Sequence, residues 1–366
     1  MIGLLEMWRR RTQFTLIALV VVLISYLVIM INGLGIGLNE RAGSALLNLD
    51  ADAFAYPTAA ELSIIRAEMP QQMADAVVAS AGDRETALLG YTAARVEADE
   101  SDLKSTAVLG FDPDTIAEPE VVKGDRISSG APNQILADSS FLEQTGLKVG
   151  DRIVLALRLS QVEFTIVGEV DEGYFFFQPV VYITRDAWRS LKYGDVDQAP
   201  VASVVLIKGN DAESVSGDGF EVVNKDTAFA NIEGVAGQQS TVQALRAFGF
   251  IIGALVIGVF FYVLTLQKVA QHGVLKAIGA SSFYIFRQLL IQVVLISAIG
   301  IVISIPLAWA TGWALSQSAD GVPIAFTNTA FVLTAIALLI AGIIGALFSG
   351  RQVLKVDPII ALGQQL

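Results

Sequence analysis

Four long stretches without a single charged side chain constrain this sequence more than any other feature. They occupy residues 13–38, 248–266, 289–315 and 330–348. A helix that crosses a bilayer needs about 20 mostly apolar residues. A buried helix of a soluble protein can be equally apolar over a shorter run, but four such stretches make that interpretation weak. We therefore expect a membrane protein with four transmembrane helices.

The positive charges beside these stretches predict the orientation of the chain. Cytoplasmic flanks of membrane helices are enriched in Lys and Arg. The flanking cations are Arg9, Arg10, Arg11, Lys268, Lys276, Arg287, Arg351 and Lys355. All of them fall on one side of the membrane if both termini are cytoplasmic. Residues of about 39–247 then lie outside the cytoplasm.

The N-terminal segment resembles a secretory signal at first sight, because three arginines precede an apolar run. That run is about 25 residues long, which exceeds the 7–15 residues of a signal, and no A-x-A-like cleavage site follows it. We expect it to be a membrane anchor. In residues 1–12, Ile2, Leu4, Leu5 and Trp8 alternate with charged residues, which predicts a short helix on the inner membrane surface.

Composition separates the chain into an apolar part and an acidic part. Hydrophobic residues make up 54% of the chain and charged residues 16%, and yet the net charge is −12. Segment 39–247 contains 16 basic and 33 acidic residues, a net charge of −17. Such an acidic surface keeps a domain soluble, and it also repels anions.

The cysteine and histidine counts exclude several kinds of site. The chain has no cysteine, which excludes disulfides, cysteine-bound zinc, iron–sulfur clusters and thiol catalysis. Its single histidine, His272, lies in a cytoplasmic segment. We therefore expect no metal site, no intrinsic cofactor and no catalytic residues.

The extracytoplasmic segment has the pattern of a mixed α+β domain. Short runs rich in Val, Ile and aromatic residues predict strands at 153–157, 164–170, 175–183 and 201–207. Helices are predicted at 59–69 and 139–145. The aromatic run Tyr174–Phe177 is interpreted as a buried strand, with a ligand site as the alternative. The glycine-rich segments around 146–151 and 164–183 are similar to the periplasmic core domain of MacB-type permeases.

The cytoplasmic segment 267–288 carries the most recognisable motif. It contains Gly273, Val274, Leu275, Lys276, Ala277, Ile278, Gly279 and Ala280. A short helix between two spans is a lever that a cytoplasmic partner can push, and His272 is interpreted as part of it. The run resembles the FtsX-like permease motif, and the tail 356–362 resembles the end of that family's domain. Gln271 departs from the motif, because relatives often carry Glu there.

The resemblance to MacB/FtsX-like permeases implies partners that composition does not reveal. It implies an ABC transporter in which two copies of the permease, a homodimer, pair with two ATPase subunits. This chain has no G-x-x-x-x-G-K-[ST] run, so ATP and Mg²⁺ would be bound by the partner ATPase. The permease itself would be no enzyme. We expect it in a bacterial cell membrane, in contact with lipid and without nucleic acid.

Within this family the chain resembles the DevC- and HrtB-like permeases, and the HrtB group exports haem. Without Cys or a suitably placed His, the axial ligands of haem would be Met, Tyr or Glu. Tyr26 and Met30 share one face of the first span, in its outer half. Phe248 and Phe250 begin the second span at a matching level, and two cations at the outer mouth, Arg41 and Arg246, would pair with the propionates.

Three alternatives remain open from the sequence. Met, Tyr and Phe within a span often only pack against neighbouring helices. The cargo could instead be a lipid or a peptide. The chain could also be a signalling permease of the FtsX type, in which ATP cycles move the extracytoplasmic domain and nothing crosses. A membrane enzyme is poorly supported, because no acid–base constellation is recognisable.

Overall fold

The computed structural model describes residues 11–98, 102–128, 130–157, 160–194, 196–267, 274, 278–316 and 322–354. The chain divides into two compact units. Residues 1–38 and 239–366 form the first, which we call the helical unit, and residues 39–238 form the second, the inserted domain.

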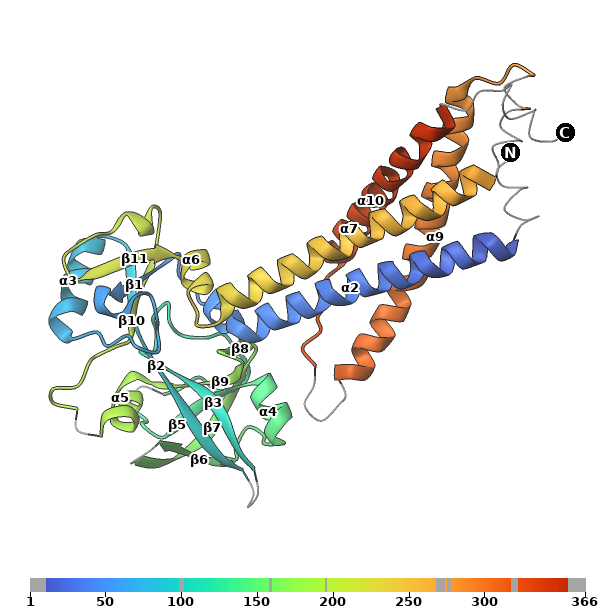
Figure 1. Ribbon diagram of the computed structural model, residues 1–366. Helices are drawn as coiled ribbons and strands as arrows, with labels where there is room; N and C mark the ends of the chain where they lie inside the picture. Colours follow the sequence, from blue (N-terminus) through green and yellow to red (C-terminus); the bar gives the residue numbers. More distant parts are fainter. Residues whose placement is uncertain are drawn as a thin grey trace. The chain divides into compact units, whose positions relative to one another are not determined.

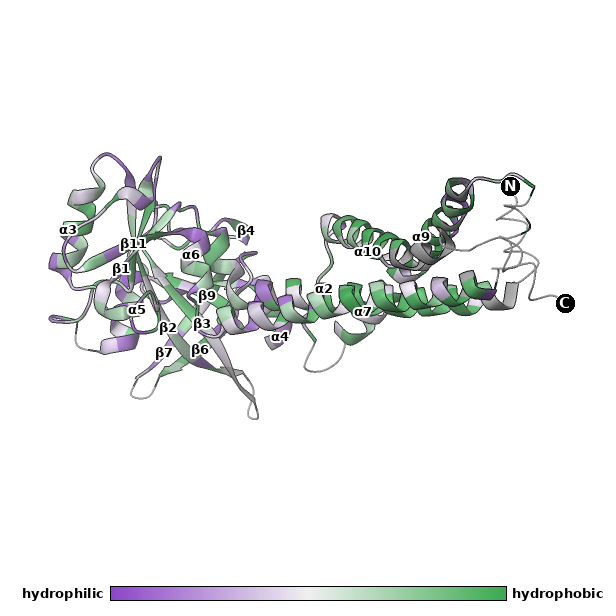
Figure 2. Ribbon diagram, turned by 45° about the horizontal axis from the view of Figure 1, so that its top comes forward, coloured by the Kyte–Doolittle hydropathy of each residue, from purple (hydrophilic) through white to green (hydrophobic). Residues whose placement is uncertain are grey.

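Four long apolar helices dominate the first unit, as the sequence predicts (Figures 1 and 2). They are α2 (Arg11–Asn48), α7 (Val235–Gln267), α9 (Ser282–Ser316) and α10 (Asn328–Leu354). Each is long and apolar enough to cross a membrane. A helix satisfies its backbone hydrogen bonds internally, which is what a segment surrounded by lipid requires.

All four helices continue beyond the apolar stretches that reveal them, and α2 and α7 do so furthest. Helix α2 runs past Leu38 to Asn48, and α7 begins at Val235, before Phe248. The last turns of α2 are amphipathic, because Ala42, Ala45 and Leu46 are buried in the core of the inserted domain. Such helix ends are held by packing rather than by lipid, so a search for uncharged stretches does not find them.

Small residues let the helices of the first unit approach closely. A Cβ atom built on Gly345 of α10 would lie 2.3 Å from the carbonyl oxygen of Ala254 on α7. The side chain of Asn32 on α2 donates a hydrogen bond of 2.8 Å to Thr334 on α10. Close packing and interhelical hydrogen bonds replace the hydrophobic effect as the source of helix association in a bilayer.

All strands in the described part of the chain belong to the inserted domain. They are β1 (Ala53–Pro57), β2 (Glu85–Ala98), β3 (Asp102–Phe111), β4 (Val121–Gly124), β5 (Gln134–Asp138), β6 (Arg152–Leu157), β7 (Ser160–Val170), β8 (Tyr174–Phe175), β9 (Gln178–Thr184), β10 (Val204–Lys208) and β11 (Phe220–Asn224). The helices are α3 (Gln71–Ala81), α4 (Ser139–Thr145), α5 (Arg185–Tyr193) and α6 (Lys225–Ala230), with short 3₁₀ turns η1 (Thr58–Ala60) and η2 (Ala212–Ser214).

Strand β2 belongs to two sheets at once. Its first residues pair with β10 and complete a four-stranded antiparallel sheet in the order β11-β1-β10-β2. Its later residues pair with β3 on one side and β6 on the other. From β3 the pairing continues through β9, β5 and β7 to β6, so six strands close into a barrel. A closed barrel leaves none of these strands as a free edge.

Each face of the four-stranded sheet is buried, and so is the barrel interior. One face packs against the end of α2 and against α6, through Phe54 and Leu206 among others. The other face packs against α3, through Val205 and Ile207. This two-sided burial explains why every residue of β1 is buried.

A tryptophan covers the point where β2 passes from one sheet to the other. Gly90 of β2 and Gly110 of β3 are register partners. Cβ atoms built on them would lie 2.3 and 2.5 Å from atoms of Trp188 on α5, whose side chain is fully buried. The two glycines therefore form a notch that fits the indole, and the pair explains why glycine occurs within two adjacent strands.

Two local predictions differ from the structure. The predicted helix 59–69 consists of η1 followed by turns, because Glu61 and Leu62 have positive φ angles of 50° and 59° that end the helix. The predicted strand 175–183 is two strands, β8 and β9, joined by a turn at Phe176 and Phe177. The helix predicted at 139–145 is confirmed as α4, whose Asp138 side chain accepts a hydrogen bond from the backbone N–H of Ser140.

Filling the glycine notch should destabilise the inserted domain. We expect Gly90→Ala to lower the free energy of unfolding by about 1–3 kcal/mol, because the new methyl group would overlap the buried indole. Urea unfolding followed by tryptophan fluorescence measures this change. Gly237→Ala is the matched control, since a Cβ atom there meets nothing within 4 Å. Equal stability of the two variants would contradict the notch.

Candidate functional site

The residues predicted to hold a substrate divide between the two units. Tyr26, Met30, Phe248, Phe250 and Arg246 lie in the helical unit. Arg41 lies in the inserted domain, where its guanidinium carbon is 5.4 Å from the ring centre of Tyr174. A cation over an aromatic face is attracted by the ring. Arg41 therefore already has a partner, which the sequence did not reveal.

Helices α2 and α7 bring four of the predicted residues to one level. A Cβ atom built on Gly249 of α7 would lie 3.1 Å from the Val28 side chain of α2. Phe248 and Phe250 flank Gly249 in the sequence, while Tyr26 and Met30 lie two residues on either side of Val28. Tyr26 and Met30 are half-buried. Both pairs thus lie near one of the contacts between α2 and α7, which also meet at Ile24 and Gly253.

The two phenylalanines differ in their surroundings. Phe250 is half-buried and packs against the apolar cluster of Val28, Ile301 and Leu338. Phe248 is 62% exposed. Phe250 therefore stabilises the helix packing, and Phe248 is the ring that remains free to contact another molecule.

Arg246 is a half-buried cation on α7, beside α2. Its Nη2 atom lies 2.8 Å from a Cβ atom built on Gly35, so the guanidinium rests directly on the backbone of α2. Its Nε atom is buried and has no hydrogen-bond acceptor among the described residues. The helical unit has three carboxylates in its sequence, Glu6, Asp320 and Asp357, and all three lie outside the described residues. A charged side chain that is half-buried between apolar helices usually has a functional role.

The glycines at the end of the first span have a structural role. A Cβ atom on Gly33 would overlap the ring of Phe326, and one on Gly37 would lie 2.3 Å from the carbonyl oxygen of Pro323. Gly35, between them, faces Arg246 instead. Gly33 and Gly37 thus leave room for the segment before α10 on one face of α2. Gly35 leaves room for Arg246 on another face.

Only part of the predicted lever lies within the described residues. Gly273, Leu275, Lys276 and Ala277 lie outside them, as do His272 and the tail 356–362. The backbone N–H of Ile278 donates to the carbonyl of Val274 at 3.1 Å, and Gly279 has a positive φ angle of 99°. Beyond Ala280, Ser281 accepts a hydrogen bond from the N–H of Tyr284 as α9 begins. Val274, Ile278 and Phe283 are exposed, so this segment offers apolar side chains to a partner.

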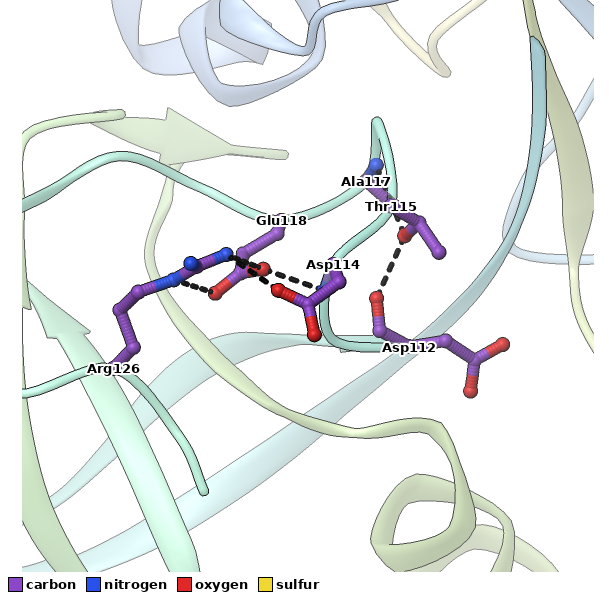
Figure 3. A network of polar contacts seen from close by, with 6 residues as sticks. All are labelled: Asp112, Asp114, Thr115, Ala117, Glu118 and Arg126. Atoms are coloured by element: carbon purple, nitrogen blue, oxygen red, sulfur yellow. Dashed lines mark hydrogen bonds and ion pairs between the residues drawn. The ribbon is translucent and has the colours of Figure 1, made fainter. Parts of the chain in front are cut away.

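The inserted domain contains a polar cavity of about 1080 Å³. Its lining includes Asp114, Glu118, Glu120, Glu172 and Arg126. Figure 3 shows Arg126 facing two of these carboxylates. The Arg126 Nε atom donates to Glu118 at 2.6 Å, and its Nη2 lies 3.3 Å from Asp114. The hydrogen bond with Glu118 raises the pKa of Arg126, and the two paired side chains line one wall of the cavity.

A buried carboxylate, Asp138, lies next to Glu172 of the cavity lining. Asp138 is fully buried and accepts hydrogen bonds from the backbone N–H groups of Glu172 and Gly173, at 2.7 and 2.6 Å. Burial raises the pKa of Asp138 above its usual value, although these hydrogen bonds oppose the shift. Burial also raises the pKa of Glu172, and the nearby charge of Asp138 adds to the effect.

Comparisons with known proteins agree with the arrangement of the helical unit. Residues 244–358 match the family described as FtsX-like permease C-terminal. The chain carries an FtsX-like permease domain. This domain covers α7, α9 and α10 and the lever between the first two, which is the part of the chain where the sequence motif was recognised.

Relatives resemble the permease over nearly its whole length. A putative hemin transport system permease protein HrtB of Staphylococcus haemolyticus is 27% identical over 96% of this chain and 96% of its own. The HrtB protein of Staphylococcus epidermidis is 21% identical over 96% and 95%. The pyoverdine export protein PvdT of Pseudomonas syringae pv. tomato is 26% identical over 73% of this chain and 39% of its own. The chain is thus a permease of an ABC-type transporter.

Two solved structures show a weaker likeness. One is the periplasmic region of MacB from Actinobacillus actinomycetemcomitans, with a TM-score of 0.36 at 11% identity, over 52% of this chain and 96% of that one. The other is the extracellular domain of the transporter YknZ from Gram-positive bacteria, with a TM-score of 0.33 at 11% identity, over 48% and 99%.

The buried carboxyls predict how stability depends on pH. Asp138 and Glu172 bind protons more strongly in the folded state than their usual values of 3.8 and 4.5 imply. The folded state therefore holds more protons just above those values, and stability falls as pH rises through that window. We expect the melting temperature of the inserted domain to rise as the pH is lowered from neutral toward 4.5, the ordinary value for Glu, and Glu172→Gln to weaken this dependence.

Thermal unfolding of the full chain, followed by circular dichroism across that pH range, measures this effect. Glu163→Gln is the matched control, because that exposed carboxylate forms only a surface ion pair with Arg152. A slope that is the same in the Glu172→Gln variant and the original protein would contradict the assignment.

Proposed function

We propose that this permease exports haem, driven by a separate ATPase subunit that binds ATP and Mg²⁺. The observation that carries the proposal is the contact of α2 with α7 at Val28 and Gly249, with Tyr26 and Met30 close to it on one helix and exposed Phe248 on the other. The likeness to proteins named as hemin transport permeases, over 96% of the chain, supports the same cargo.

Each of these side chains suits one part of a haem molecule. Met and Tyr are axial ligands of haem iron in other proteins. An exposed aromatic ring stacks favourably on a flat conjugated ring. The guanidinium of Arg246, whose Nε lacks an acceptor among the described residues, would bind a propionate through charge-assisted hydrogen bonds.

The remaining components of the transporter belong to the same proposal. The exposed apolar residues of the lever, Val274 and Ile278, would contact the ATPase. A second copy of the permease would complete the complex as a homodimer. Both termini would be cytoplasmic, and the inserted domain would lie on the outer side of a bacterial cell membrane.

Removing the Arg246 cation should weaken haem binding through its propionates. We expect Arg246→Ala to bind haem about tenfold more weakly, the usual loss for a charge-assisted hydrogen bond. Its affinity for haem dimethyl ester, which lacks the carboxylates, should equal that of the original protein. Titration of the purified complex, followed at the Soret band, gives both affinities, with Arg287→Ala on α9 as the control.

The axial ligand is tested in the same titration. We expect Met30→Ala to shift the Soret band, because the iron loses an axial ligand, while Leu27→Ala, at an exposed position of α2, leaves it unchanged. A spectrum identical in all variants would remove Met30 from the site. A complex that hydrolyses ATP and binds no haem would instead favour the signalling function of FtsX-like permeases.

A further inference from the structure

The end of α2 is held by a hairpin of the inserted domain. Gly43 leaves the helical conformation within α2, with φ −173° and ψ 36°. Just before it, the carbonyl of Arg41 accepts a hydrogen bond of 2.7 Å from the N–H of Phe177, and the carbonyl of Ala42 accepts one of 2.8 Å from the N–H of Phe176. The helix is thus bound through its own backbone at the point where it bends.

Side chains on both sides of the bend reinforce this contact. The hydroxyl of Ser44 accepts a hydrogen bond of 2.8 Å from the N–H of Tyr174, and the side chain of Asn48 donates one of 3.2 Å to the carbonyl of Glu172. Arg41 lies over the ring of Tyr174. We call these contacts between residues 41–48 and 172–177 the α2 clamp.

The turn that makes the clamp is strained. Phe176 and Phe177 are the whole of the two-residue connection between β8 and β9, and their φ angles are 51° and 62°. Turns of this kind favour Asn-Gly, because both positions require the left-handed conformation that is costly for other residues. Strain of this kind persists only where the surroundings hold it in place.

Burial accounts for one of the two phenylalanines only. Phe176 packs against the apolar core of the domain. Phe177 is 41% exposed, and its described contact is the hydrogen bond from its N–H to Arg41. Once that bond is lost, a rearrangement of the β8–β9 turn can relieve the strain at Phe177 without breaking a further contact of this residue with α2, so the strain favours an open clamp.

We propose that the Phe176–Phe177 turn is a strained clamp on α2 that opens during each cycle of ATP hydrolysis. The proposal rests on the proposed function in that it requires a partner ATPase, but it does not require haem as the cargo. Helix α2 is apolar from Phe14 to Leu38 and ends in the clamp. A displacement along α2 would therefore act first on the hydrogen bonds of Arg41 and Ala42.

A single cysteine reports on the clamp, because the chain has none of its own. Ser44→Cys places a thiol against the N–H of Tyr174 in the closed clamp. In the complex with its ATPase, we expect maleimide to modify Cys at this position faster during ATP hydrolysis than without nucleotide. Ser128→Cys, at an exposed position outside the clamp, should react at one rate in both conditions. Equal rates at position 44 would overturn the proposal.

Two substitutions of Phe177 separate strain from the loss of its ring. Phe177→Gly and Phe177→Ala both remove the ring, but only glycine adopts a positive φ without cost. In the Ser44→Cys background, we expect the glycine variant to favour the closed clamp about tenfold over the alanine variant, with slower modification during ATP hydrolysis. Export should fall in the glycine variant alone.

The same measurements separate a failure of this inference from a failure of the proposed cargo. Modification of position 44 that depends on ATP, in a complex that binds no haem, would keep the clamp and remove haem. Glycine and alanine variants that behave alike would show that strain at Phe177 has no part in the cycle. Haem export that continues beside them would leave the proposed function standing.

Discussion

A bilayer supplies no partner for a backbone N–H or carbonyl, and this constraint determines how the helical unit is built. Its four helices satisfy their own hydrogen bonds, so they associate through close contacts rather than through polar backbone groups. The contact of Gly345 with Ala254 and that of Gly249 with Val28 are of this kind. Tyr26, Met30 and Phe248 lie at a similar level to the second of them.

In such a unit, a polar side chain without a hydrogen-bond partner indicates where a ligand could bind. Asn32 has a partner in Thr334, but the Nε of Arg246 has no acceptor among the described residues. In the inserted domain the opposite holds, because Arg126 is paired with Glu118 and Arg41 lies over Tyr174. The contrast separates a cation that can receive a ligand from cations that hold the fold together.

The sequence predicts the membrane helices well, because an uncharged apolar run of about 20 residues is rare outside a bilayer. It also predicts α4, a feature that depends on local residues, because Asp138 is a good helix cap. It does not reveal the barrel, because closing it requires pairings between distant segments, such as β3 with β9 and β2 with β6. It also does not show that Phe176 and Phe177 form a turn, since two phenylalanines are poor turn residues and only the contact with α2 explains their conformation. For the site, residue counting gives the depth of Tyr26 and Met30 in the first span, and their part in a site stays a prediction, whereas the partner of Arg41 depends on tertiary packing.

The order of the strands has a consequence for biosynthesis. Strand β1 pairs only with β10 and β11, so Ala53 must wait for Ile207 and Asn224 before it has neighbours on either side. Pairing between such distant segments is slow, and unpaired strands are prone to aggregate. Synthesis delivers α2 long before β11, so the apolar anchor is available to the membrane while the inserted domain is still incomplete. A stop codon or ribosomal stall after β1 and before β11 would leave an anchored chain whose first strand lacks its outer partner, a natural substrate for quality-control proteases.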